Sequence, residues 1–237
     1  MVYPATFTTS STLKRLIAFA YNTNDFQISG GPGWINSETY EVDGKVPDSL
    51  VEELQKLPFD LRREKMNSMI QSLLAERCKL KVSHKTKELP VYALLVARNG
   101  SKLQEAKPGE TYPNGGHPHS GTDDAGRIEG RAIPISAPRG MSLAWLLTSE
   151  LGRTVLDQTG LKGKYDFTLQ WTPDQIPAAM GIGPEGGKPA NENPPTPDSS
   201  GPSLFAAIQE QLGLKLESTK GPVEILVIDH IERPSEN

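Results

Sequence analysis

A histidine-rich segment near the middle of the chain offers the most obvious set of metal ligands. His117 and His119 flank a proline, and Asp123 and Asp124 follow shortly after. Imidazole and carboxylate groups are suitable ligands for a transition metal. The segment is rich in glycine, proline and polar residues, so metal binding would have to order it at a cost in conformational entropy. We therefore predict no metal site and no cofactor.

A short motif, Asp157-Gln158-Thr159-Gly160, is similar to the Asp-Thr-Gly of aspartic proteases. Gln158 interrupts the tripeptide, and the first half of the chain has no second copy of it. The motif instead predicts a turn in which Asp157 accepts hydrogen bonds from backbone amides and Gly160 takes a positive φ.

The single cysteine, Cys78, could act as a nucleophile if a histidine lay beside it. It stands in an apolar helical run and matches Leu212 of a second, similar run. Free cysteine often behaves as a small hydrophobe, so we predict a buried structural thiol. One cysteine also excludes an internal disulfide and a multi-cysteine zinc site.

Trp34 is the aromatic residue most suited to contact a ligand. It follows the glycine-rich turn 30–33, where packing is less constrained than on a strand face. The aromatics on strand faces are assigned to the core, because aromatic rings contribute the largest burial energies. His230 is a polar residue at the end of an apolar strand. We predict Trp34, Asp157 and His230 as ligand-binding residues and assign no catalytic residue.

The composition sets bounds on the function. The chain has 237 residues, a length that allows one large domain or two small ones. Of these residues 36% are hydrophobic and 23% are charged, a composition that allows a packed core. The formal net charge of -4 argues against a general nucleic-acid binder. No apolar run approaches the roughly 18 residues that a membrane-spanning helix needs. We therefore expect a protein or peptide partner rather than nucleic acid or a membrane span.

An approximate internal repeat organises the chain. The run from Leu80 to Val96 is matched by the run from Leu214 to Ile228, and an amphipathic segment precedes each. Such self-similarity predicts a fold made by doubling one unit. We expect each run to form a β-hairpin around its polar stretch, with strands 80–84 and 90–97 in the first and 214–218 and 222–229 in the second.

Capping residues mark the helices. Thr12, Ser142 and Ser203 each precede an apolar run with helical spacing, and a side-chain oxygen at this position caps the first turn. Gly152 and Gly213 follow the second and third of these runs, where glycine ends a helix in the left-handed conformation. A fourth helix opens near Pro58 and has an apolar face formed by Met66, Met69, Ile70, Leu73 and Leu74.

Strands are predicted on either side of the repeat. Residues 39–42 read as a strand that follows the glycine-rich turn. Tyr165, Phe167, Leu169 and Trp171 alternate with polar residues, which indicates a half-buried strand.

Two segments have little apolar content to bury. Residues 100–127 separate the two halves, and residues 172–202 are rich in proline and glycine. We predict both as surface loops. The chain then divides into a first half at 1–99, a linker at 100–127 and a second half at 128–237.

Five stretches resemble a large paralogous family of uncharacterised proteins from soil bacteria of the acidobacterial type. They extend over nearly the whole chain and are Gln27–Trp34 (QISGGPGW), Leu74–Val82 (LAERCKLKV), Glu88–Leu94 (ELPVYAL), Leu156–Phe167 (LDQTGLKGKYDF) and Gly221–His230 (GPVEILVIDH). Members of this family usually begin with a signal peptide and an extra strand, and some are fused to membrane-bound antirepressor-type zinc-peptidase sensors. The resemblance implies an extracytoplasmic role in binding or sensing. The chain as written has no signal-peptide pattern, so the location is cytoplasmic if Met1 is the native start.

Together these features predict an α+β protein with an internal duplication. Each half is helix–strand(s)–helix–β-hairpin, with helices packed on an antiparallel sheet. The unit is similar in plan to the helix–strand interaction modules of secretins and TonB-dependent receptors, an analogy of shape. We favour a non-enzymatic module that binds a peptide, an envelope component or a partner protein at an exposed strand edge or groove.

Two alternatives to a binding module stay open. A hydrolase of unfamiliar type would need polar residues of the two long segments to meet Asp157 or His230 over one pocket. The chain could also be the ligand-sensing domain of a signalling system.

Overall fold

The fold is that of a computed structural model, which describes residues 6–57, 59–107, 116–119, 126–137, 141–172 and 201–234. Helices, parallel strand pairs and antiparallel strand pairs all occur, so the predicted α+β class is confirmed. Two compact units are present: unit 1 contains residues 1–89 and 221–237, and unit 2 contains residues 90–220. These units are defined by contacts rather than by sequence similarity, so the duplication and the halves at 1–99 and 128–237 stay predictions.

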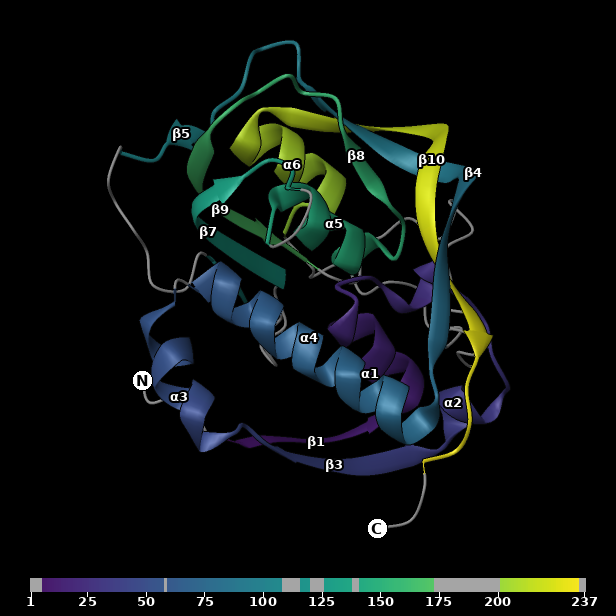
Figure 1. The fold of residues 1–237 in the computed structure, drawn as a ribbon. Helices are drawn as coiled ribbons and strands as arrows, with labels where there is room; N and C mark the ends of the chain where they lie inside the picture. The colour runs from purple at the N-terminus through teal and green to yellow at the C-terminus, as the bar shows by residue number, and fades with distance from the viewer. Residues whose placement is uncertain are drawn as a thin grey trace. The chain divides into compact units, whose positions relative to one another are not determined.

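Unit 1 contains a two-stranded ribbon and a long helix, α4 (Phe59–Cys78), that packs on the short helix α1 (Leu13–Ala20) (Figure 1). Strand β1 (Thr6–Thr12) pairs antiparallel with β3 (Thr39–Lys45) over all seven residues, without a bulge. Further elements of this unit are the 3-10 helix η1 (Asp25–Gln27), strand β2 (Ile28–Gly30) and helices α2 (Trp34–Ser37) and α3 (Asp48–Lys56).

The core of unit 1 forms where α1 meets α4. Thr12 caps α1 as predicted, because its hydroxyl accepts a hydrogen bond from the Arg15 N–H at 3.4 Å. The predicted apolar faces of both helices are buried at their centres, and Cys78 is only 2% exposed. The buried residues of this core are Leu13, Leu16, Ile17, Ala18, Ala20, Ile28, Ile35, Ile70, Leu74, Cys78, Leu80, Leu226 and Ile228.

The glycine-rich turn closes against strand β10 (Leu214–His230). Strand β2 pairs parallel with β10, with Gly30 opposite Ile228. Gly30 and Gly31 have φ of 82° and 79°, and a Cβ on Gly30 would lie 2.9 Å from the Ile228 carbonyl oxygen. Only glycine combines this backbone conformation with so close an approach. The predicted turn is therefore confirmed.

The two predicted hairpins are wrong. Strand β4 (Lys81–Val96) and strand β10 each run without a turn through the polar stretch that was expected to reverse the chain. The stretch 85–88 contains no glycine, proline, asparagine or aspartate, so it lacks the residues that tight turns favour. Its side chains are exposed, and polar residues fit a strand wherever its faces meet solvent. The four-stranded sheet has the order β2-β10-β4-β8.

Unit 2 contains a second four-stranded sheet with helices on it (Figure 1). Its order is β5-β9-β7-β6, and every neighbouring pair is antiparallel. The strands are β5 (Gln104–Glu105), β6 (Gly116–His119), β7 (Gly126–Pro134) and β9 (Lys164–Trp171). Helices α5 (Leu143–Leu151) and α6 (Leu204–Leu212) contact this sheet, and β8 (Val155–Asp157) pairs parallel with β4.

The predicted helix ends and strand alternation of unit 2 are confirmed. The hydroxyl groups of Ser142 and Ser203 cap α5 and α6, and Gly152 and Gly213 end them with φ of 60° and 65°. Strand β9 alternates buried and exposed residues, with Trp171 in the core.

Two glycines of β7 make room for aromatic rings of β9. Gly126 lies opposite Trp171, and Gly130 lies opposite Phe167. A Cβ would lie 2.2 Å from the Trp171 ring at the first glycine and 2.3 Å from the Phe167 ring at the second. Real atoms do not approach this closely, so each ring occupies the volume of a missing side chain.

The predicted linker 100–127 contains strands, which corrects its description as a surface loop. It holds β5, β6 and the start of β7. Its polar composition hid them because β6 and β5 form the two edges of the sheet, where one side of the main chain faces away from other strands. The predicted loop at 172–202 lies almost wholly outside the described residues. In the described part of the chain, no helix is long and apolar enough to cross a membrane.

Candidate binding site

Trp34 packs against the core of unit 1 and contacts Arg233 near the C-terminus. It begins α2, is half-buried and contacts the core. The Arg233 guanidinium lies 5.1 Å from the centre of its ring, a cation–π distance. One face of the Trp34 ring is therefore in contact with Arg233 of the same unit.

Glu38 joins Arg233 to the ribbon. Arg233 donates to both carboxylate oxygens of Glu38, with N···O distances of 2.7 and 3.3 Å, and the Tyr40 hydroxyl donates at 2.7 Å. The Arg233 guanidinium and the Tyr40 hydroxyl hold the pKa of Glu38 below its ordinary value. The Glu38 carboxylate in turn raises the pKa of Tyr40. Trp34, Glu38 and Arg233 thus hold the segment that contains Pro234 against unit 1.

A cavity of about 160 Å³ lies in unit 1 next to this segment. Its apolar floor comes from α1 and α4, and Pro234 forms part of its wall. Charged side chains of Glu41, Asp43 and Arg77 complete the lining, so the hollow combines apolar and polar surface. The lining residues are Leu13, Leu16, Tyr40, Glu41, Val42, Asp43, Leu73, Leu74, Arg77, Cys78 and Pro234.

Four consecutive residues of β3 line the cavity. Residues 40–43 all line it, although successive side chains of a strand point to opposite faces. A cavity that touches four consecutive residues is therefore lined in part by main-chain atoms of the strand. No residue of β1 lines it, and β1 is the only described strand that pairs with β3. The strand that lines the cavity thus also has one edge without a strand partner among the described residues.

A second hollow of about 140 Å³ continues along α4. Leu73 belongs to both hollows. Phe7 and Gly44 of the ribbon face Met66 and Met69 of the helix across it. Methionine adapts its shape easily, so this wall can adjust to different apolar groups.

The other two predicted ligand residues lie elsewhere. His230 is exposed and pairs with Glu232 at 2.9 Å. Asp157 belongs to unit 2, whereas Trp34 and His230 belong to unit 1. None of the three lines the cavity.

Asp157 forms the predicted turn. It accepts hydrogen bonds from the Thr159 N–H at 2.9 Å, the Thr159 hydroxyl at 2.7 Å and the Ser136 hydroxyl at 2.8 Å. Gly160 has a φ of 71°, as expected. The carboxylate is thus used to organise its own loop, and its assignment as a ligand contact stays a prediction.

The chemistry of the cavity favours contact rather than bond formation. Burial raises the pKa of the Cys78 thiol, so at neutral pH it is the uncharged, weakly nucleophilic form. No group of three potential metal ligands occurs in the described ranges. His117 and His119 belong to β6, but Asp123 and Asp124 lie outside those ranges, so the absence of a metal site stays a prediction.

Sequence reasoning missed both the cavity and the strand edge. The strand predicted at 39–42 is part of β3, but its partner β1 was not predicted. The sequence of β1, TFTTSST, has a single aromatic and otherwise small polar residues, so its alternation carries little hydrophobic signal. Alternation of Tyr40, Val42 and Gly44 was the available indication that one face of the ribbon covers something.

The comparisons with known proteins confirm one part of the family resemblance, namely that the chain belongs to a family of unknown function. The family model described as "Protein of unknown function (DUF3738)" matches residues 14–231. The chain therefore belongs to the DUF3738 family. It matches no curated protein and no solved structure.

Proposed function

We propose that this protein is a non-enzymatic binding module that takes an extended peptide segment of a partner protein at the edge of β3. The observation that carries the proposal is a partly apolar cavity lined by β3, a strand whose second edge has no strand partner among the described residues. In strand addition, main-chain hydrogen bonds supply affinity and a pocket beside the strand selects a side chain. The volume and lining suit one aliphatic or small aromatic side chain.

The extracytoplasmic setting implied by the family resemblance remains part of this proposal. The hydrolase alternative needs residues from the segments 100–127 and 172–202, much of which lie outside the described residues. No contact in the described part of the chain favours it. The sensing alternative is compatible with the same site, because a sensor domain also needs a binding surface.

The test is a peptide selection followed by measurement of binding. A library of random peptides is displayed on phage and selected on the purified protein, and the selected sequences are synthesised and measured by calorimetry. We expect peptides with strand-forming residues around one apolar anchor. Hydrogen exchange should slow at β3 amides when such a peptide binds.

Matched variants localise the binding. Val42→Trp places a large ring in the cavity and should weaken binding at least about tenfold, which corresponds to about 1.4 kcal/mol. Thr39→Trp adds the same ring at an exposed position of the same strand and should leave binding unchanged. Equal binding by both variants, or unchanged exchange at β3, would overturn the proposal.

A further inference from the structure

A second strand edge, that of β9 in unit 2, has one residue whose main chain lacks a partner, in the part of the chain that the structure describes, between two residues that have one. Strand β9 pairs with β7 along one edge, and along the other edge β5 covers only Tyr165 and Asp166. Gln104 lies opposite Asp166. The outer edge of β9 beyond Asp166 therefore has no strand beside it in the described part of the chain.

A side-chain amide occupies part of this edge. Gln211 of α6 accepts a hydrogen bond from the Gln170 N–H at 2.9 Å and donates to the Gln170 carbonyl at 2.8 Å. The primary carboxamide of Gln211 thus makes the same two bonds that a neighbouring strand would make. This pairing also shows that a carboxamide can approach the outer edge of β9 and bond its main chain.

Thr168 lies between Asp166, which pairs with β5, and Gln170, which is bonded by the Gln211 side chain. Main-chain groups of alternate residues point to the same edge of a strand, so Thr168 presents its N–H and C=O beside those of Gln170. Continuing the register of β5 would place residue 102 opposite Thr168, but the Lys102 N–H donates to the Leu212 carbonyl instead. Within the described residues, no group hydrogen-bonds to the main chain of Thr168 at this edge.

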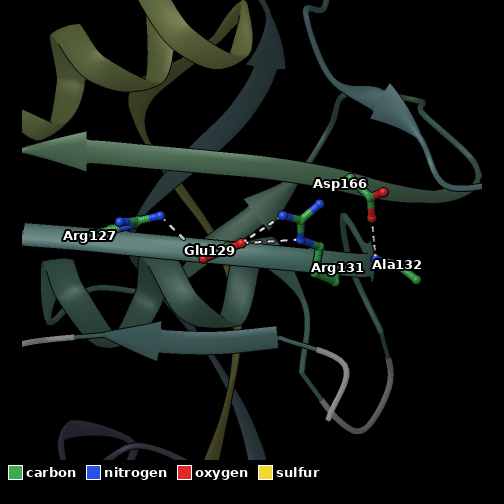
Figure 2. A network of polar contacts seen from close by, with 5 residues as sticks. All are labelled: Arg127, Glu129, Arg131, Ala132 and Asp166. Atoms are coloured by element: carbon green, nitrogen blue, oxygen red, sulfur yellow. Dashed lines mark hydrogen bonds and ion pairs between the residues drawn. The ribbon is translucent and has the colours of Figure 1, made fainter. Parts of the chain in front are cut away.

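A polar pocket of about 280 Å³ opens at this position. Lys102 is held there because its ammonium group donates to the Glu210 carbonyl. Figure 2 shows two further lining residues, Arg131 on β7 and Asp166 on β9, with Asp166 accepting from the Ala132 N–H at 2.7 Å. The complete lining is Lys102, Gln104, Arg131, Asp166, Phe167, Thr168, Gln211 and Leu212.

We infer that this pocket binds a primary carboxamide, which pairs with the main chain of Thr168 as Gln211 pairs with Gln170. The occupied positions lie about 6.8 Å to either side along the strand. That spacing admits one end group but not an added strand. Asp166 and Lys102 offer an acceptor and a donor around the group. The carboxamide comes from a free small molecule or from an asparagine or glutamine side chain of a partner.

The experiment titrates the isotopically labelled full-length protein with L-glutamine and follows backbone amide signals by NMR. We expect a saturable shift of the Thr168 amide with a millimolar dissociation constant, and no such shift with L-glutamate. A parallel titration uses the peptides acetyl-Ala-Gln-Ala-methylamide and acetyl-Ala-Glu-Ala-methylamide. A stronger response to the glutamine peptide than to free glutamine assigns the carboxamide to a partner side chain, and the reverse assigns it to a small molecule.

Two variants test the main-chain contact. Thr168→Pro removes the N–H, which proline permits at a strand edge, and should abolish the shifts that glutamine causes at the neighbouring amides of Phe167 and Leu169. Thr168→Val keeps the N–H and should respond like the parent. An unshifted Thr168 amide in the parent protein, an equal response to glutamate, or a response retained in Thr168→Pro would overturn the inference. The comparison of glutamine with glutamate on the parent protein does not depend on how well the variants fold.

Discussion

The two strand edges solve the same physical problem in different ways. An unpaired edge exposes main-chain donors and acceptors that can pair with another chain. At β9 the edge is shortened by β5 on one side and by the Gln211 amide on the other. At β3 one edge has no strand partner within the described residues, and the strand lines a partly apolar cavity.

The difference indicates that the β9 edge is protected against pairing with another chain, whereas the β3 edge is available to bind one. A side-chain amide satisfies main-chain groups without offering apolar surface, so the β9 edge has room for a small polar group. An apolar cavity beside a free edge offers both hydrogen bonds and a place for a side chain, which is the combination that peptide recognition uses. The contrast predicts that changes at the two edges have different consequences.

The largest effect is expected at the floor of the β3 cavity. Leu74 is 1% exposed and belongs to the core between α1 and α4. Leu74→Ala should lower the free energy of unfolding by about 2–5 kcal/mol, because buried contacts are lost and the cavity grows. Urea unfolding measures this change. Leu61→Ala is the control, since Leu61 is 48% exposed, and an equal loss for both would show that Leu74 does not support the site.

The next effect is expected on the inner face of β9. Gly130→Val would force a side chain into the Phe167 ring and should cost about 1–3 kcal/mol of stability. The control is Gly33→Ala, because Gly33 has an ordinary φ of -57° and an added Cβ meets nothing within 4 Å. Thermal unfolding of the two variants compares them. If Gly130→Val melts like the parent, the ring is not packed as described.

Removing the amide cap should make the β9 edge behave more like that of β3. Gln211→Ala leaves the Gln170 main chain without its partner and should cost about 1 kcal/mol. It should also increase self-association at high concentration, because an unprotected edge pairs with another copy. Sedimentation measures association, with Gln209→Ala, an exposed position on the same helix, as control. No difference between the variants would argue that Gln211 does not protect the edge.

The smallest effect is expected at the segment that closes the β3 cavity. The pKa of Glu38 is lowered by Arg233 and Tyr40, so its interactions stabilise the folded state above the ordinary carboxyl pKa. That stabilisation is lost as the pH falls through the lowered folded-state value. Both charged groups are exposed, so the shift in melting temperature should be small.

A pH series tests this contribution. Melting temperatures from pH 7 to pH 3 are compared for the parent and Glu38→Gln. The difference between them should shrink toward the acid end. A difference that does not change with pH would remove the charge of Glu38 as its cause.

The sequence predicted features that depend on local chemistry. Thr12, Ser142 and Ser203 cap helices because a side-chain oxygen finds the first free N–H groups wherever the helix lies. Gly160 was placed correctly for the same reason, since a tight turn needs a positive φ. Cys78 was correctly expected to be buried because it continues an apolar helical face.

Features set by distant parts of the chain were not predicted. The stretch 85–88 was predicted as a turn because it is polar, but polar residues also suit an exposed strand, and the neighbouring strand of the sheet decides between the two. The cavity needs β3, α1, α4 and the segment around Pro234 together, and no local pattern records that they leave a space between them. The contact between Trp34 and the distant Arg233 was likewise not predicted, and the assignment of Trp34 as a ligand contact stays a prediction.

The ring–glycine pairs of β7 and β9 also constrain how the sequence can change. At Gly126 even one added carbon atom would collide with Trp171, so a larger residue at position 126 requires a smaller one at position 171. A library that randomises both positions together should return folded proteins in which a larger residue at 126 occurs with a smaller one at 171. The pair would then covary in size, and glycine at 126 would mark the presence of a large ring across the sheet rather than the need for a flexible backbone.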